Sequence, residues 1–162
     1  MFGKVIDKKE YVSFITEYKT SMYRIAYGYL GDESKSLDAV DEAVYLGYKH
    51  LKELREPQYL KTWLTRILIN ECYKIIRKCS RETATDVLPE EVVVESEFKL
   101  PLKMALQELE EDLKKVIVLR YFGGYTIAET ASILNIPEGT CSTRTRKALG
   151  LLRLELVDQK GE

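Results

Sequence analysis

One segment constrains the fold of this chain more than any other: Tyr125 to Arg153, YTIAETASILNIPEGTCSTRTRKALGLLR. Thr126 with Glu129 three residues later is a capping box, which predicts that a helix begins there. The Asn-Ile-Pro run at 135–137 predicts a tight corner, because proline suits the first position of a following helix. Two short helices joined by a corner, the second with a basic face, are typical of a helix-turn-helix that reads duplex DNA.

The second helix of this segment has two chemically different faces. At about 100° per residue, one arc is mainly apolar and is expected to be buried: Cys141, Thr145, Ala148, Leu152 and Leu156. The opposite arc combines small side chains with cations that can reach guanine edges or phosphates: Gly139, Ser142, Thr143, Arg146, Lys147 and Arg153. Arg144 projects sideways, where a phosphate contact is expected, and the backbone N–H of Thr140 at the helix start can also meet a phosphate. A basic helix face alone is as often merely solvated, but the capped preceding helix and the proline corner favour DNA binding.

The charges of the chain are segregated along its length. Its formal net charge is −1, from 25 Lys and Arg against 26 Asp and Glu. Residues 61–81 contain six basic residues and one acidic residue, residues 82–97 contain six acidic and no basic residues, and residues 144–153 contain four basic and no acidic residues. Two basic patches separated by an acidic segment can bind phosphate at two places in a protein that is neutral overall.

Helical periodicity predicts a bundle of three helices in the first half. Apolar residues recur at steps of three and four from Tyr11 to Tyr29, and Gly31 suits a C-terminal cap. A second helix is expected to bury Leu37, Val40, Val44, Tyr48 and Leu51. Pro57 marks a break, and a third apolar stripe runs from Leu60 to Ile76. Short turns between antiparallel helices favour one small bundle.

The periodicity is lost over residues 79–99 and returns at Pro101. Further helices are expected over residues 102–109 and 112–122, before the helix-turn-helix. The sequence therefore predicts an all-α chain of two small helical domains, a three-helix bundle at 1–79 and a four-helix domain at 100–162. An acidic linker at 80–99 joins them.

The third helix carries cations around an aromatic residue and an amide, in the stretch KTWLTRILINECYKIIRK. Trp63 and Asn70 lie among Lys61, Arg66, Lys74, Arg77 and Lys78. Aromatic and basic residues together suit single-stranded nucleic acid, where a base stacks and a phosphate pairs. The alternative interpretation is that Trp63 belongs to the core.

At these residues the chain resembles a known family, the sigma-70-type initiation factors of the extracytoplasmic-function (ECF) group. TWLTRILINECYKIIRK is similar to the family's second conserved region, with matches at Thr62, Trp63, Leu64, Arg66, Ile67 and Asn70. SLDAVDEAVYLGYK resembles the preceding acidic helix, and ALQELEEDLKKVIVLRYFGGYTIAETASILNIPEGTCSTRTRKAL resembles the fourth region. Two motifs in the right order make the resemblance specific, and it is nearest to envelope-stress factors of low-GC Gram-positive type.

The resemblance implies that residues 1–79 are sigma region 2, which engages core RNA polymerase and the melted −10 element, and that residues 100–162 are region 4, which reads the −35 element. It implies a polymerase-binding set on the second helix: Asp38, Asp41, Glu42 and Tyr45. It implies a −10 set on and before the third helix: Arg55, Lys61, Trp63, Arg66, Asn70, Lys74 and Arg77. The −35 set implied on the last helix is Thr140, Ser142, Thr143, Arg144, Arg146 and Lys147.

The implied partners are core RNA polymerase, promoter DNA and a membrane-anchored anti-sigma factor, with no small-molecule substrate and no cofactor. The chain departs from the family pattern at Asp41, where Gln is usual, and at Val44, where an aromatic residue is usual. Glu56-Pro57 replaces the Phe-Arg-Gly run of the loop that captures a flipped base, which puts the −10 preference in question. Thr143 and Arg146 indicate a distinct −35 preference.

Other classes of function are disfavoured. His50, the one histidine, lies on a polar helical face with no nucleophile or metal-ligand spacing around it, so an enzyme is not expected. No run of 18 apolar residues and no signal-peptide core occur, so a cytoplasmic protein is expected. The cysteines at 72, 79 and 141 are expected to be buried thiols. One alternative is a dimeric helix-turn-helix regulator, which has no need for the Trp63–Asn70 pattern of the first domain. Another is a sigma-like decoy that binds a partner but no promoter, which the basic residues on both helices disfavour.

Overall fold

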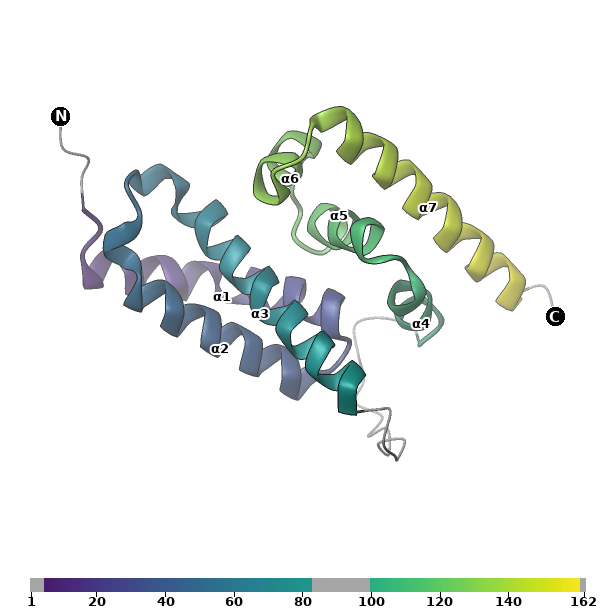
Figure 1. Cartoon of the computed structure of the whole chain (residues 1–162), viewed down its shortest axis with the longest axis horizontal. Coiled ribbons are helices and arrows are strands. Elements are labelled where there is room, and N and C mark those ends of the chain that lie inside the picture. The colour runs from purple at the N-terminus through teal and green to yellow at the C-terminus, as the bar shows by residue number, and fades with distance from the viewer. Residues whose placement is uncertain (1–4, 83–99, 161–162) are drawn as a thin grey trace.

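The computed structural model describes residues 5–82 and 100–160, in which all regular secondary structure is helical. Figure 1 shows two groups of helices side by side, α1–α3 in one and α4–α7 in the other. The all-α architecture of two small domains expected from the sequence is confirmed. The predicted linker lies outside the described residues apart from its first three, which continue the third helix.

The first domain consists of α1 (Lys8–Leu30), α2 (Glu33–Lys49) and α3 (Leu60–Glu82). Asp7 and Glu10 form a capping box at the start of α1, with the Glu10 amide donating to Asp7 Oδ1 at 2.8 Å. Gly31 ends α1 in the left-handed region at φ 64°, where glycine carries no steric penalty. The 3-10 turns Leu51–Glu53 and Pro57–Tyr59 connect α2 to α3.

The inward face of α2 differs from the expectation. Leu37 and Tyr48 were predicted to be buried, and they are instead 44% and 47% exposed. The buried face of α2 carries small side chains: Ser36, Ala39, Val40, Ala43 and Gly47. These bring α2 close to its neighbours, and a Cβ at Gly47 would lie 2.5 Å from Tyr11 Oη. The helix is therefore rotated to bury its small residues rather than its largest apolar ones.

The second domain consists of α4 (Leu100–Glu108), α5 (Glu111–Tyr121), α6 (Ile127–Leu134) and α7 (Glu138–Lys160). The predicted capping box is present, with Glu129 N donating to Thr126 Oγ1 at 3.1 Å and Thr126 N to Glu129 Oε1 at 3.0 Å. Asn135 adopts a left-handed conformation at φ 56°, and the Ile136 amide donates to the Ala131 carbonyl at 3.0 Å. The helix-turn-helix geometry predicted for this segment is confirmed.

The two domains share one hydrophobic core. It continues from Ile25 and Leu68 of the first domain to Ile117 and Leu119 of the second. Helix α5 packs against α1, α6 and α7, and α6 packs against α3. Residues 116–119 are consequently all buried, although a surface helix would normally bury a single stripe.

Candidate nucleic-acid and polymerase interfaces

The apolar arc of α7 is buried as predicted. Cys141 and Ala148 are fully enclosed, and Thr145 and Leu152 are buried beside them, whereas the side chain of Leu156 lies outside the described part of the chain. The Thr145 hydroxyl donates to the Cys141 carbonyl at 2.8 Å, so this polar group is satisfied inside its own helix. Cys141 packs in a cluster with Val116 of α5 and Ala131 of α6. These contacts fix the rotation of α7 about its axis.

This rotation turns the opposite arc of α7 to solvent. Thr143, Arg146, Lys147 and Arg153 are exposed, and Ser142 and Thr140 are half-buried. The Thr143 hydroxyl donates back to the Gly139 carbonyl at 2.9 Å, which leaves its methyl group and oxygen on the helix surface. The four side chains Ser142, Thr143, Arg146 and Lys147 form a short polar and cationic strip, here called the α7 outer face. Such a strip can enter a DNA major groove.

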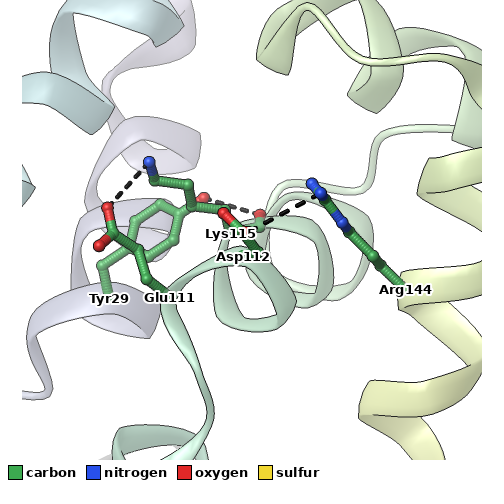
Figure 2. Close-up of polar contacts among 5 residues, drawn as sticks. All are labelled: Tyr29, Glu111, Asp112, Lys115 and Arg144. Carbon is green, nitrogen blue, oxygen red and sulfur yellow. Dashed lines mark hydrogen bonds and ion pairs between the residues drawn. The ribbon is translucent and has the colours of Figure 1, made fainter.

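Arg144 lies beside the α7 outer face and has a partner within the chain. Its Nη2 atom is 3.7 Å from Oδ2 of Asp112 in the first turn of α5 (Figure 2). The two residues border an open cleft between the starts of α5 and α7, which Thr140 and Lys147 also line. The distance between the two atoms exceeds that of a hydrogen bond, so the ion pair is weak. Arg144 can therefore leave Asp112 and bind another anion. Sequence reasoning had not identified Asp112, because no local spacing links it to Arg144.

Helix α3 displays most of the predicted −10 set at the surface. Lys61, Arg66, Asn70, Lys74 and Arg77 are exposed on α3, and Arg55 is exposed in the loop before it. Trp63 is half-buried and packs against the clusters that contain Leu60 and Leu64. The tryptophan thus has one side in the core and another accessible, so both sequence interpretations describe part of its environment.

Three of the α3 cations already have partners within the chain. Arg66 donates from Nε to the Ile133 carbonyl at 2.8 Å and from Nη2 to the Ser132 carbonyl at 2.5 Å, both at the end of α6. The Lys61 ammonium lies 5.0 Å from the centre of the Tyr125 ring. Lys74 forms an ion pair with Glu71 at 2.9 Å. Two of these three contacts reach the second domain, which sequence reasoning did not anticipate.

The predicted polymerase-binding residues form one exposed face of α2. Asp38, Asp41, Glu42 and Tyr45 are all exposed. Leu37 and Tyr48, which had been expected inside the bundle, lie among them. At about 100° per residue these side chains span an arc of roughly 140°, opposite the small buried residues. We call this arc the α2 outer face, defined by Leu37, Asp38, Asp41, Glu42, Tyr45 and Tyr48. In the sequence, the stripe of small residues on the opposite side of the helix was the signal that could have located this outer face.

The remaining reactive side chains are inert or paired. Cys72 is fully buried, and burial raises the pKa of its thiol to about 12, so it stays protonated. Burial also raises the pKa of the Cys141 thiol. Cys79 is half-buried rather than buried. His50 caps the end of α2 and its Nδ1 lies 2.9 Å from Glu53 Oε1. No helix within residues 5–82 and 100–160 is long and apolar enough to cross a lipid bilayer.

Comparison with known proteins gives matches to both domains. The family model for sigma-70 region 2 matches residues 14–82, and the model for sigma-70 region 4 matches residues 99–152. RNA polymerase sigma factor SigV of Bacillus subtilis (strain 168) is 29% identical over 163 residues, which cover 98% of each chain. ECF RNA polymerase sigma factor SigW of the same organism is 29% identical over 171 residues, covering 94% of this chain and 91% of that protein.

Two solved structures have a similar fold. The sigma factor RpoE, in complex with the anti-sigma factor NepR from Bartonella quintana, aligns with a TM-score of 0.76 and 25% identity, over 91% of this chain and 97% of that one. CnrH, in complex with the cytosolic domain of CnrY, aligns with a TM-score of 0.73 and 17% identity, over 94% of this chain and 90% of that one. Both alignments extend across the two helical domains.

Proposed function

The chain belongs to the sigma-70 family, in its extracytoplasmic-function group, and from this premise we propose how its surfaces direct transcription initiation. It is an initiation factor and not an enzyme: it binds core RNA polymerase and directs it to promoters through −10 and −35 elements. Residues 1–79 act as region 2, residues 80–99 as a linker and residues 100–162 as region 4. It works in the cytoplasm, where polymerase and DNA are found.

One observation carries this proposal. Two separate cationic helix faces, on α3 and on α7, lie in two domains that match region 2 and region 4 in that order. A conventional helix-turn-helix regulator needs a helix face that reads duplex DNA, as α7 has. It does not need the exposed asparagine and the accessible tryptophan that lie among cations on α3. The regulator alternative is therefore not favoured.

The α7 outer face reads the −35 element in this proposal. Arg146 and Lys147 reach base edges in the major groove, because burial of Cys141 and Ala148 directs them outward. Ser142 and Thr143 allow close approach. Thr140 and Arg144 meet backbone phosphates, which position the helix without reading sequence.

The exposed face of α3 contacts the melted −10 region. Asn70 offers both a donor and an acceptor to a base edge, and Trp63 offers part of its ring for stacking. Phosphates pair with the surrounding cations: Arg55, Lys61, Arg66, Lys74 and Arg77. Glu56 lies in the connecting loop, where its Oε2 accepts a 2.9 Å hydrogen bond from Gln58 Nε2. An acidic loop of this kind favours a −10 preference that differs from that of factors with a Phe-Arg-Gly loop.

Core polymerase binds the α2 outer face. This face combines carboxylates with exposed apolar rings, and Tyr45 is 56% exposed near its centre. Aromatic anchors flanked by charges are typical of the central part of a protein–protein interface. Leu37 and Tyr48 extend the face beyond the four residues expected from the family resemblance.

An anti-sigma factor, anchored at the membrane, holds the chain inactive until a signal releases it. Support comes from the similar RpoE, whose structure was solved with the anti-sigma factor NepR. Purification from unstimulated cells is expected to yield a complex. Recovery of only free or polymerase-bound protein would count against sequestration.

Run-off transcription from a promoter library tests the proposed function. The purified chain is assayed with core polymerase, without it, and beside core polymerase alone. Defined transcripts are expected only when both are present. A chain that binds duplex promoters equally well without core polymerase, and yields no transcripts with it, would indicate a conventional regulator instead.

A further inference from the structure

Tyr59, at the entrance to α3, lies outside the residues that the sequence resemblance assigns. It comes three residues before Thr62, where the match to the second conserved region begins. Its side chain is 54% exposed, and it makes no hydrogen bond or ring contact with another residue of the described part of the chain. A single exposed tyrosine is common on protein surfaces and indicates no function by itself. The informative feature of Tyr59 is its position relative to the −10 set.

The backbone at Tyr59 is fixed by the fold. Pro57 opens the 3-10 turn that ends at Tyr59, and the Tyr59 amide donates to the Glu56 carbonyl at 3.0 Å. Leu60 follows with helical dihedral angles, φ −54° and ψ −47°, so the turn continues directly into α3. The Leu60 side chain is buried in the core of the first domain. The start of α3 therefore sets the direction in which the Tyr59 side chain leaves the backbone.

Tyr59 shares one face of α3 with three members of the −10 set. At about 100° per residue, these three lie within about 40° of its direction: Trp63, Arg66 and Asn70. The buried leucines of the helix point about 100° or more away from it: Leu60, Leu64 and Leu68. The strip of α3 proposed to contact the −10 element thus begins with an accessible tyrosine, about one turn before the half-buried tryptophan.

The spacing of the two aromatic residues suits nearby bases of one strand. Tyr59 and Trp63 are four residues apart, which is about 6 Å along the helix axis at about 1.5 Å per residue. Nucleotides of one strand advance by about 3.4 Å each when they are stacked, so the two rings are about two nucleotides apart. A base on Trp63 and a base on Tyr59 can therefore belong to the same short unpaired segment. Arg55, exposed in the loop just before Tyr59, can neutralise a phosphate of that segment.

The chemistry around Tyr59 favours a base as the partner of this side chain. Its phenol ring can stack on the π-face of any base, and such stacking needs no particular base sequence. Glu56, three residues earlier, is an exposed carboxylate that accepts a 2.9 Å hydrogen bond from Gln58, and its charge disfavours a phosphate close to it. Trp63 has one side in the core, so Tyr59 is the more accessible of the two rings.

We propose that Tyr59 is a stacking surface for an unpaired base of the melted −10 segment, about one turn of α3 before Trp63. The base lies against the exposed side of the phenol ring, and Arg55 neutralises a neighbouring phosphate. The inference rests on the proposed function, and it adds a DNA-contacting residue at a position to which the resemblance gives no role. Because the contact needs a base that has left the duplex, Tyr59 strengthens binding to melted DNA and not to paired DNA.

Two substitutions at Tyr59 separate the aromatic ring from the rest of the side chain. Tyr59→Leu removes the ring, Tyr59→Phe keeps it, and Tyr121→Leu is the matched control, since Tyr121 at the end of α5 is 56% exposed and lies outside the proposed contacts. Each full-length chain, combined with core polymerase, is titrated with a fully paired promoter and with one whose −10 segment is held open by mismatches. Tyr59→Leu should bind the open promoter about 5-fold to 20-fold more weakly than wild type. The paired promoter, and both promoters with the other two variants, should change by less than about 2-fold.

Removal of single bases from the open strand locates the contact. Wild type should lose a similar factor in affinity at one abasic position of the −10 segment, and Tyr59→Leu should lose nothing further at that position. Additive losses at every position would overturn the inference, as would wild-type affinity in Tyr59→Leu, an equal loss in Tyr59→Phe, or weaker binding of Tyr59→Leu to core polymerase itself. Failure of the proposed function is seen separately, because the wild-type chain would then give no transcripts with core polymerase.

Discussion

Arg144 of α7 and Asp112 of α5 lie 3.7 Å apart, so the arginine proposed to meet a DNA phosphate is held beside a carboxylate in the free protein (Figure 2). Asp112 is exposed and the pair is half open to solvent, which limits its contribution to stability to about 0.2–1 kcal/mol. The carboxylate orients the arginine and also competes with phosphate for it. The two effects can be separated by substituting each partner.

Arg144→Ala is expected to weaken binding to all −35 duplexes alike. A lost phosphate contact lowers the slope of log affinity against log salt by about one unit and leaves sequence preference unchanged. Asp112→Asn should strengthen binding to all duplexes by up to about 5-fold, because it removes the competing anion. Fluorescence anisotropy over a series of salt concentrations measures both. A change of preferred sequence in Arg144→Ala would show that α7 is rotated from its proposed orientation on DNA.

Arg146→Ala is expected to change which −35 sequences are preferred. A bidentate arginine–guanine contact contributes about 1–3 kcal/mol of discrimination at one base pair. Selection of binding sites from a randomised −35 duplex should therefore lose its preference at one position. Arg24→Ala, an exposed arginine on α1 outside the proposed contacts, is the control and should keep the wild-type selection. Equal selection profiles for wild type and Arg146→Ala would rule out direct base reading by this residue.

Asn70→Ala is expected to impair promoter melting more than promoter binding. Its side chain is exposed on α3, so the substitution should leave the fold intact. Loss of contacts to an unpaired base should reduce permanganate reactivity of the bubble, while band shifts of the closed complex stay near wild type. Gln107→Ala, an exposed amide on α4 outside the proposed contacts, serves as control. An unchanged permanganate footprint would remove Asn70 from the −10 set.

Charge reversal on α2 is expected to weaken core polymerase binding selectively. Asp38→Lys combined with Asp41→Lys changes the sign of the α2 outer face at exposed positions, so the circular dichroism spectrum should not change. The equilibrium dissociation constant for core polymerase should rise by about 10-fold or more. Glu17→Lys, an exposed reversal on α1, is the control. Normal core affinity in the double variant would reject this face as the docking site.

Local signals explain what the sequence could predict. The capping box of Thr126 and Glu129, the corner after Asn135 and the buried arc of Cys141 and Ala148 each depend on residues a few positions apart. Their geometry is decided within one or two helical turns. The same signals placed the basic strip of α7 on the outside before any tertiary contact was known.

The features that the sequence did not predict depend on contacts between distant segments. Leu37 and Tyr48 were expected inside, but the small residues on the other side of α2 permit a closer approach that only the packed bundle reveals. The contact of Arg66 with the carbonyl of Ile133 joins residues 67 positions apart, and no spacing rule reports such a pair. Docking of the two domains is likewise a property of complementary surfaces rather than of periodicity.

A pair of buried tyrosines gives a last prediction, on stability. Tyr11 Oη donates to the Val44 carbonyl at 2.6 Å, whereas the buried Tyr73 hydroxyl has no hydrogen-bond partner within the described part of the chain. Removing a satisfied buried hydroxyl costs about 0.5–1.5 kcal/mol, and removing an unsatisfied one relieves about 1–3 kcal/mol. In urea unfolding near neutral pH, Tyr11→Phe should therefore lower the free energy of unfolding, and Tyr73→Phe should raise it.

The pH dependence of the same two variants provides an independent check. Burial raises the pKa of Tyr11 to about 12 and also raises the pKa values of Tyr73, Tyr18 and Tyr29. A phenol with a raised pKa stabilises the fold below its unfolded pKa, about 10, and this stability is lost as pH rises towards the folded pKa. Burial raises the pKa of Tyr125 as well, and those of the Cys72 and Cys141 thiols. Lys114 acts in the opposite sense, since burial lowers its pKa, but one amine opposes five phenols and two thiols. Stability should fall above about pH 9, the pKa of an unfolded thiol, and above about pH 10 it should fall less steeply in either tyrosine variant than in wild type. Tyrosinate absorbance and circular dichroism, recorded together, should show part of the ionisation coinciding with loss of helix; complete ionisation of a folded chain would contradict this.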